Sequence, residues 1–262
     1  MPTIDSKYVL QAATELAKSP KVQAGLGLLL ALGVLPRLNR WLSRLALNNY
    51  VLDKTWDWKK EVVIVTGGSS GIGACIVTKL QERKVYKIII LDLISPKGKL
   101  GKDRRWFRKN PDIMNSYVVN LLIFNPANNT YYYQVDLSSG VEITDVANKI
   151  RATHGDPTVL INNAGIGNGV KIMSLDEAQL QKVFAVNIIA HFLLIHQFLP
   201  EMIRRNHGHI VTIASMASFG TQATNVDYAC TKAGALTFHE GLTQELRLVY
   251  NSPLVRTTYV GR

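Results

Sequence analysis

The stretch Thr66-Gly67-Gly68-Ser69-Ser70-Gly71-Ile72-Gly73 decides the fold because of what lies on either side of it. Residues 62–65 (VVIV) have the pattern of a short buried strand, and a helix is expected from the glycines to about residue 84. Positions without side chains let a backbone approach a pyrophosphate, and the first N–H groups of a helix hold its negative charge. The stretch therefore predicts a phosphate site, with a purely structural turn as the alternative.

An acidic residue follows this turn at the end of the next predicted strand, over residues 87–93. Asp92 comes nineteen residues after Gly73, where its carboxylate can accept hydrogen bonds from an adenosine ribose. The same negative charge would repel a 2′-phosphate. Because Leu93 follows Asp92 and Ser70, not arginine, precedes Gly71, the sequence favours NAD over NADP.

Strand and helix patterns alternate along the rest of the chain. They predict an α/β fold, a Rossmann-type doubly wound parallel sheet, over residues 60–262, preceded by an apolar segment over residues 1–59. The further strands are expected at 131–135, 158–162, 208–215 and 255–260, and the helices at 141–153, 175–205 and 236–250.

The pentapeptide Tyr228-Ala229-Cys230-Thr231-Lys232 carries the predicted chemistry. On a helix the tyrosine and the lysine lie one turn apart, so an ammonium can sit beside a phenol. A free tyrosine has a pKa of about 10, and a positive charge about 4 Å away stabilises phenolate by roughly 4 kcal/mol, enough for proton exchange near neutrality. Residues 50–54 have the same spacing, but only Tyr228 follows a strand that ends in a hydroxyl, Ser215, thirteen residues earlier.

These motifs, in this order, resemble those of the short-chain dehydrogenases/reductases over residues 60–94 and 131–260. The resemblance adds Asp136-Leu137, Asn162-Asn163-Ala164-Gly165 and Asn187 to the turn, the serine and the tyrosine–lysine pair. The cofactor-binding residues it implies are Thr66, Gly67, Ser69, Ser70, Gly71, Ile72, Gly73, Asp92, Asp136, Leu137, Asn163, Ala164, Gly165, Tyr228 and Lys232. The catalytic residues it implies are Asn187, Ser215, Tyr228 and Lys232.

The resemblance also implies what each catalytic residue does in an NAD(P)-dependent oxidoreductase that transfers hydride to or from an alcohol or carbonyl. Tyr228 exchanges the proton of the reacting oxygen, and Lys232 favours the phenolate and holds the nicotinamide ribose. Ser215 donates a hydrogen bond to the reacting oxygen, while Asn187 positions a water in a proton relay.

The most apolar run, residues 22–35 (VQAGLGLLLALGVL), has basic residues on both sides. Fourteen residues make about 21 Å of helix against a hydrocarbon core of about 30 Å, so a perpendicular crossing is too short. Leu38, Trp41, Leu42 and Leu45 then recur at helical spacing between arginines, as in an interfacial helix. A monotopic or hairpin membrane anchor fits this pattern best, with a core helix or a secretory signal as alternatives.

This segment makes the chain similar to the membrane- or lipid-droplet-associated branch that includes retinol and 17-beta-hydroxysteroid dehydrogenases. That resemblance implies a lipophilic retinoid, steroid or fatty alcohol or carbonyl, a homodimer, and a cytosol-facing position on endoplasmic reticulum or lipid droplets. The two cysteines, Cys75 and Cys230, show no metal-ligand spacing, so no metal site is expected. They are consistent with a reduced, cytosol-facing compartment.

The net charge of +11 is concentrated in two regions. Residues 1–60 carry +5 and residues 95–130 carry +5, which leaves +1 for the rest of the chain. Since the basic residues lie outside the predicted catalytic body and no RNA-binding or zinc motif accompanies them, a nucleic-acid partner is not expected.

Two features depart from the family pattern. Residues 95–130 form an atypical insert between the second and third predicted strands, either a surface loop that contacts anionic lipid or an error in the gene structure. The sequence ends at Gly261-Arg262, where the family continues into a substrate loop and a last strand. The alternative hypothesis is therefore a catalytically impaired, membrane-attached dinucleotide-binding or scaffold protein.

Overall fold

The structure, a computed structural model, describes residues 18–47, 56–96 and 129–261. It divides into two units, Met1–Tyr50 and Val51–Arg262. The predicted insert lies almost entirely in residues 97–128, outside the described residues.

The described part of the first unit is dominated by one helix, α2 (Pro20–Leu47). The apolar run and the amphipathic segment predicted after it belong to this continuous helix, with Pro36 inside it. Leu35, Leu38, Trp41 and Leu42 are exposed in α2.

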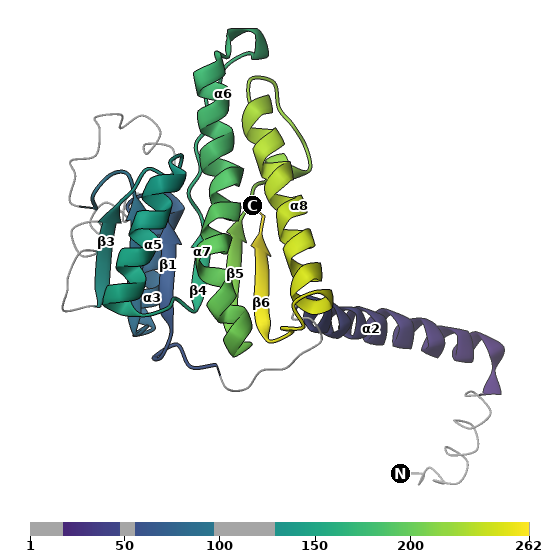
Figure 1. Cartoon of the computed structure of the whole chain (residues 1–262). Coiled ribbons are helices and arrows are strands. Elements are labelled where there is room, and N and C mark those ends of the chain that lie inside the picture. The colour runs from purple at the N-terminus through teal and green to yellow at the C-terminus, as the bar shows by residue number, and fades with distance from the viewer. Residues whose placement is uncertain (1–17, 48–55, 97–128, 262) are drawn as a thin grey trace, which may run out of the picture. The chain divides into compact units, whose positions relative to one another are not determined.

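The described part of the second unit is built on one sheet of six parallel strands, which runs from β3 at the left of Figure 1 to β6 at its centre. The strands are β1 (Val62–Thr66), β2 (Lys87–Asp92), β3 (Thr130–Gln134), β4 (Val159–Asn162), β5 (Gly208–Ile213) and β6 (Val255–Val260). Their order is β3-β2-β1-β4-β5-β6, so the chain winds outward from β1 in one direction and then crosses to β4 and winds outward in the other. This order confirms the predicted Rossmann-type doubly wound sheet.

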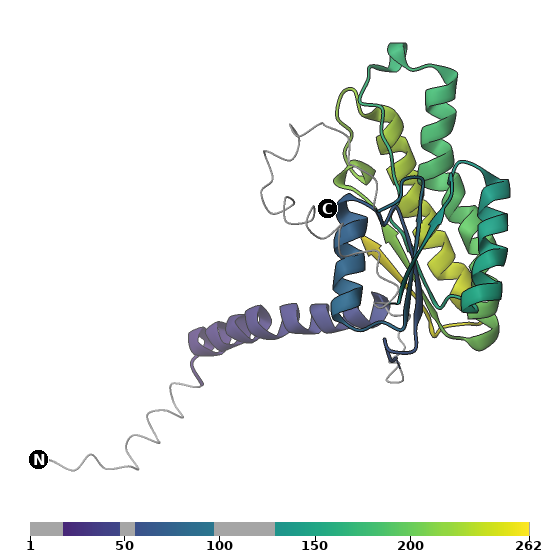
Figure 2. The same ribbon diagram turned by 90° about the vertical axis from the view of Figure 1, so that its left-hand side faces the viewer.

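Helices cover both faces of the sheet (Figure 2). They are α3 (Gly71–Glu82), α5 (Gly140–His154), α6 (Glu177–Phe184), α7 (Ala190–Arg205) and α8 (Val226–Leu248), with short turns η3 (Ile172–Ser174), η4 (Ala185–Ile189) and η5 (Met216–Ser218). Alternate strand residues pack on opposite sides: Ile64 joins the core under α5, α7 and α8, whereas Val63 and Val65 pack against α3. The central strands β1 and β4 are therefore apolar except for their last residues, as expected for a sheet buried on both faces.

Among the described residues, one helical stretch, Glu177–Arg205, is long and apolar enough to cross a membrane by length and composition. Leu194, Phe198 and Met202 from this stretch are buried in the core beneath the sheet. Part of its hydropathy therefore belongs to the core.

The predicted boundaries shift at two places that matter for the site. The strand expected to reach Ser215 ends at Ile213, so the serine lies in the loop just beyond it. The helix expected at residues 236–250 begins at Val226 and therefore includes the tyrosine–lysine motif near its start.

Candidate active site

The glycine turn connects β1 to α3 in a conformation that requires glycine. Gly67 has a φ of 64° in the left-handed region. A Cβ on Gly73 would lie 2.1 Å from the carbonyl oxygen of Gly67, so the first turn of α3 packs directly on the loop. The result is a backbone cradle at a helix start, which fits a phosphate group.

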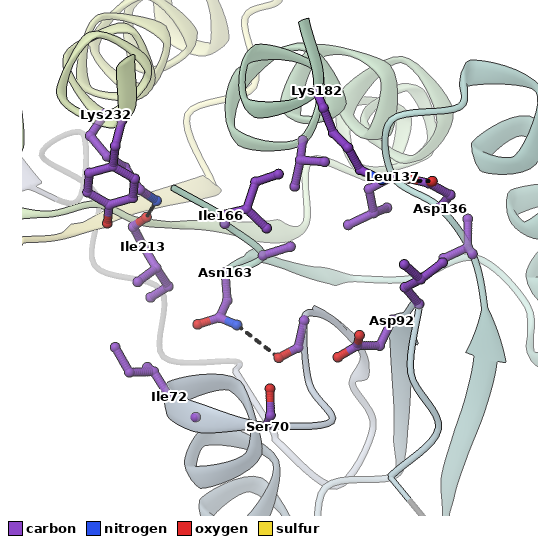
Figure 3. Close-up of a pocket in the computed structure, with 18 of the residues that line it drawn as sticks. Ser70, Ile72, Asp92, Asp136, Leu137, Asn163, Ile166, Lys182, Ile213 and Lys232 are labelled. Atoms are coloured by element: carbon purple, nitrogen blue, oxygen red, sulfur yellow. Dashed lines mark hydrogen bonds and ion pairs between the residues drawn. The ribbon is translucent and has the colours of Figure 1, made fainter. Parts of the chain in front are cut away.

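Two side chains tie this turn to the end of β4. The Asn163 amide donates to the carbonyl oxygens of Thr66 at 2.8 Å and Gly67 at 3.2 Å (the latter dashed in Figure 3). The Thr66 hydroxyl accepts from the backbone N–H groups of Asn163 at 2.9 Å and Ala164 at 3.0 Å. Thr66 is buried and does not line the cleft, so the structure gives it a supporting position.

The turn opens onto a cleft of about 420 Å³ along the carboxyl ends of the strands (Figure 3). Most of the predicted site residues line it: Gly67, Ser70, Gly71, Ile72, Asp92, Asp136, Leu137, Asn163, Ala164, Gly165, Tyr228 and Lys232. Five predicted residues lie outside this lining: Thr66, Ser69, Gly73, Asn187 and Ser215.

Asp92 is held between the turn and the end of β2. One carboxylate oxygen accepts from the backbone N–H of Ser69 at 2.9 Å, and the other accepts from that of Ile94 at 3.2 Å. Each oxygen retains a further lone pair, and the residue lines the cleft. Asp92 thus shapes the turn and remains able to accept a hydroxyl hydrogen bond.

Asp136 lies on the same side of the cleft as Asp92, just after β3, the strand that pairs with β2 (Figure 3). Its carboxylate accepts from the hydroxyl of Ser138 at 2.7 Å and from the backbone N–H of that residue at 2.9 Å. These hydrogen bonds, with a smaller contribution from Lys182 at 4.0 Å, hold the pKa of Asp136 below its ordinary value. A fixed negative charge therefore marks this end of the cleft.

Tyr228 and Lys232 enter the cleft together from α8 (Figure 3). The Lys232 Nζ lies 5.6 Å from the centroid of the Tyr228 ring and donates to the Ile213 carbonyl at 2.9 Å. Only 3% of Lys232 is exposed, and burial lowers its pKa from 10.5 to about 8. The side chain is still largely an ammonium at neutral pH.

Asn187 lies buried behind this pair in η4, a π-helical turn between α6 and α7. Its carbonyl oxygen accepts from the backbone N–H of Ile166 at 2.8 Å, and its amide donates to the Ile166 carbonyl at 2.8 Å. The amide also donates to the Thr231 hydroxyl at 2.9 Å. Single π-helical turns often occur at functional sites, and here the side chain fastens the loop after β4 to α8.

Ser215 caps η5 just beyond β5. Its hydroxyl oxygen accepts from the backbone N–H of Ala217 at 3.1 Å, and the adjacent Ala214 lines the cleft. The serine therefore stands beside the cleft but not in its lining.

The remaining cleft residues were not predicted as site residues: Leu93, Val135, Ile166, Lys182, Val186, Ile213 and Ala214. All but two of them are sequence neighbours of a predicted residue, so extending each motif by one position would have found them. Ile213 is two positions before Ser215. No motif marks Lys182, because it reaches the cleft through the packing of α6.

The profile of the short chain dehydrogenase family matches residues 118–251. Dehydrogenase RED2 of Cochliobolus heterostrophus is 40% identical over 226 residues, covering 86% of this chain and 76% of that protein. The chain is a short-chain dehydrogenase. Membership in this family makes it an NAD(P)-dependent oxidoreductase of alcohols or carbonyl compounds.

Relatives from the predicted branch also match this dehydrogenase. Retinol dehydrogenase 10-B of Danio rerio and 17-beta-hydroxysteroid dehydrogenase 13 of Homo sapiens are each 32% identical to it. Each alignment covers 71% of this chain and 56% of the relative, so the chain spans about half their length.

A crystal structure of a metagenomic short-chain oxidoreductase in complex with NADP is similar, with a TM-score of 0.64 and 28% identity. The match covers 78% of this chain and 81% of that one. Among the described residues of this dehydrogenase, no group of three or more His, Cys, Asp or Glu side chains could hold a metal ion.

Proposed function

We propose that this dehydrogenase transfers hydride between NAD and a lipophilic alcohol or carbonyl compound at the carboxyl edge of its sheet. The single observation that carries the proposal is the position of Tyr228 beside the buried Lys232 in the cleft that begins at the glycine turn. Residues 60–262 would form the catalytic domain and residues 1–59 the membrane anchor.

The residues around the cleft fit a nicotinamide dinucleotide. The close approach of Gly73 to Gly67 leaves backbone N–H groups free of side chains where a pyrophosphate would bind. Asp92 would accept from the adenosine ribose, and Asp136 would accept from the adenine amino group. When bound, the cofactor supplies the hydride acceptor or donor.

Proton exchange would fall to the phenol of Tyr228. Its Oη would take the proton from a substrate hydroxyl, or return it to a carbonyl oxygen, while the Lys232 ammonium stabilises the phenolate. An ammonium has three donors, and Ile213 takes one, so two remain for ribose hydroxyls. Ser215 would donate a hydrogen bond to the reacting oxygen. Asn187 would hold the loop beside which a water of the proton relay is positioned.

The substrate would be lipophilic because the loops that follow β4 and β5 present large apolar side chains to solvent. Met173 in η3 is 95% exposed and Phe219 just after η5 is 68% exposed, with Ile172 and Met216 beside them. Both loops follow the carboxyl ends of their strands, the edge of the sheet along which the cleft with Tyr228 runs. A retinoid, steroid or fatty chain would cover this surface, with a gain of about 25 cal/mol for each Å² buried.

NAD would be preferred over NADP. Asp92 lines the cleft at the end of β2, and its charge opposes a phosphate on the adenosine ribose. Ser69, whose backbone contacts this carboxylate, adds no positive charge.

Helix α2 would attach the protein to a membrane or lipid-droplet surface on the cytosolic side of the endoplasmic reticulum. Its exposed Trp41 and Leu42 are of the type that enters the headgroup boundary, and Arg37 and Arg40 supply positive charge for anionic lipid. Since the apolar run is shorter than a bilayer core, the proposed attachment is monotopic or hairpin-like.

A second copy of the chain would pair through α7 and α8. Ile189 and Phe192 are exposed on this surface, where a partner would cover them. Size-exclusion chromatography with light scattering tests this: Phe192→Glu should convert a dimer to a monomer.

The experiment that tests the proposed function is cofactor reduction with long-chain alcohols, retinol and steroids, comparing the wild type with Tyr228→Phe. We expect turnover in the wild type only. Tyr86→Phe, which alters an exposed tyrosine just before β2, is the matched control.

A further inference from the structure

The loop after β4, residues 163–169, lines the cleft with its first four residues and continues past Tyr228. A Cβ on Gly167 would lie 3.3 Å from Cδ2 and 3.5 Å from Cβ of Tyr228, so the backbone of this loop lies directly against the side chain. The position of the phenol and the position of the loop are therefore linked.

Side-chain contacts fasten this loop to three elements. Asn163 holds its start to the glycine turn, and Asn187 holds its middle through both polar groups of Ile166. The third contact is at its end: the Asn168 amide donates to the Asp227 carboxylate at 2.7 Å. Gly167 lies between the second and third contacts.

Asp227 directly precedes Tyr228 in the first turn of α8 and is 3% exposed. Its second carboxylate oxygen is buried and has no hydrogen-bond partner. The helix dipole favours an acidic residue in the first turn of a helix even when that residue is exposed to solvent. The dipole therefore does not explain why Asp227 is buried. Burying a carboxylate carries a desolvation cost, which the short contact to Asn168 offsets.

We propose that Asp227 is a positioning residue that, through Asn168, keeps the loop after β4 packed on Tyr228 and so sets the direction of the phenol. Neither Asp227 nor Asn168 is in the cleft lining, so both act through the loop and not on the cofactor or substrate. The kinetic consequence rests on the proposed function, whereas the loop contact itself does not.

Kinetics of single, double and exchanged variants test the role of the pair. Asp227→Ala and Asn168→Ala should each lower kcat about tenfold, as expected for loss of a hydrogen bond to a charged group, and change the KM for NAD less than twofold. Both variants break the contact between Asn168 and Asp227, and Asn168→Ala also removes a donation of 3.5 Å to the Gln179 carbonyl. The double variant should therefore be no slower than the slower single variant. Asn168→Asp, which places a second carboxylate against that of Asp227, should be slower still.

The exchanged pair Asn168→Asp/Asp227→Asn rebuilds the contact with donor and acceptor reversed and should recover activity relative to Asn168→Asp. Asn225→Ala, at the cap of α8 where the side chain makes no capping hydrogen bond, and Asp145→Ala, at an exposed position of α5, are controls. Additive losses, or no recovery in the exchanged pair while its melting temperature matches the wild type, would overturn the proposal.

Hydrogen–deuterium exchange of the protein without substrate separates this inference from the proposed function. Asp227→Ala should speed exchange at least fivefold in peptides covering residues 164–170 and leave those from β1 unchanged. If Asp227→Ala exchanges faster but the wild type turns over no substrate, the loop contact is supported and only the proposed function is contradicted. Unchanged exchange in this segment contradicts the inference, whatever the activity.

Discussion

Lys232 is held beside Tyr228 by a second element of the fold. Its Nζ lies 5.6 Å from the centroid of the Tyr228 ring and donates a hydrogen bond of 2.9 Å to the Ile213 carbonyl at the end of β5. The helix therefore supplies the spacing of the pair, and the sheet fixes where the ammonium points. This arrangement places a buried cation next to the phenol before any ligand binds.

The buried lysine predicts a stability difference that depends on pH. Lys232 has a pKa of about 8 in the folded state, lower than its ordinary 10.5 because of burial. Between these values the unfolded chain holds more protons, so the free energy of unfolding should rise with pH, by up to about 3 kcal/mol. Urea titrations should therefore show that the free energy of unfolding of the wild type, relative to that of Lys232→Met, rises between pH 8 and 10.5.

Lys149→Met, which removes an exposed lysine from α5, is the control for this titration. Lys149→Met should change the free energy of unfolding by the same amount at pH 8 and at pH 10.5. If Lys232→Met behaves in the same way, the lysine is not desolvated as described.

Asp92→Ala should weaken the preference for NAD over NADP by about tenfold, because the charge that opposes a 2′-phosphate is removed. Fluorescence titration with both reduced cofactors measures the ratio of the dissociation constants. An unchanged ratio would show that Asp92 only supports the turn through Ser69.

Removal of residues 1–48 should release the protein from membranes, because it deletes the exposed apolar surface of α2. Flotation with lipid droplets and with vesicles containing anionic lipid measures attachment of both forms. A full-length protein that stays in the soluble fraction would contradict the proposed anchor.

Phe219→Ala should raise the KM for long-chain alcohols several-fold and leave that for short alcohols unchanged, since only long chains would cover the apolar surface beside η5. Steady-state kinetics over a series of chain lengths measures the effect. Val141→Ala, at an exposed position of α5, is the control, and an equal effect on all chain lengths would exclude this surface as the substrate contact.

The strands of the sheet could be predicted from the sequence because each is marked by a short run of neighbouring residues. Apolar runs such as residues 62–65 mark strands, and the glycine turn that follows them marks a helix start. The sequence also predicted that the side chains of Tyr228 and Lys232 lie close together, since four residues make about one helical turn. The carboxyl ends of parallel strands then bring these motifs to one edge.

Contacts between distant segments were not predictable from spacing. Asn163 bonds Thr66 from a position 97 residues later in the chain, and no local pattern indicates this contact. The π-helical turn at Asn187 breaks the helical period, and Lys182 reaches the cleft only through the packing of α6. Packing therefore determined which polar side chains line the cleft and which support it.

The most direct test of the central claim is turnover and cofactor binding by Tyr228→Phe, measured on the same preparation. The variant keeps the ring that packs on Gly167 and loses only the hydroxyl, so NADH affinity should stay within about threefold of the wild type. Turnover should fall at least about a hundredfold, in the range expected for loss of general acid–base catalysis. Equal turnover in both proteins, or binding without turnover in both, would contradict the assignment of Tyr228 as the proton-exchanging residue of an active dehydrogenase.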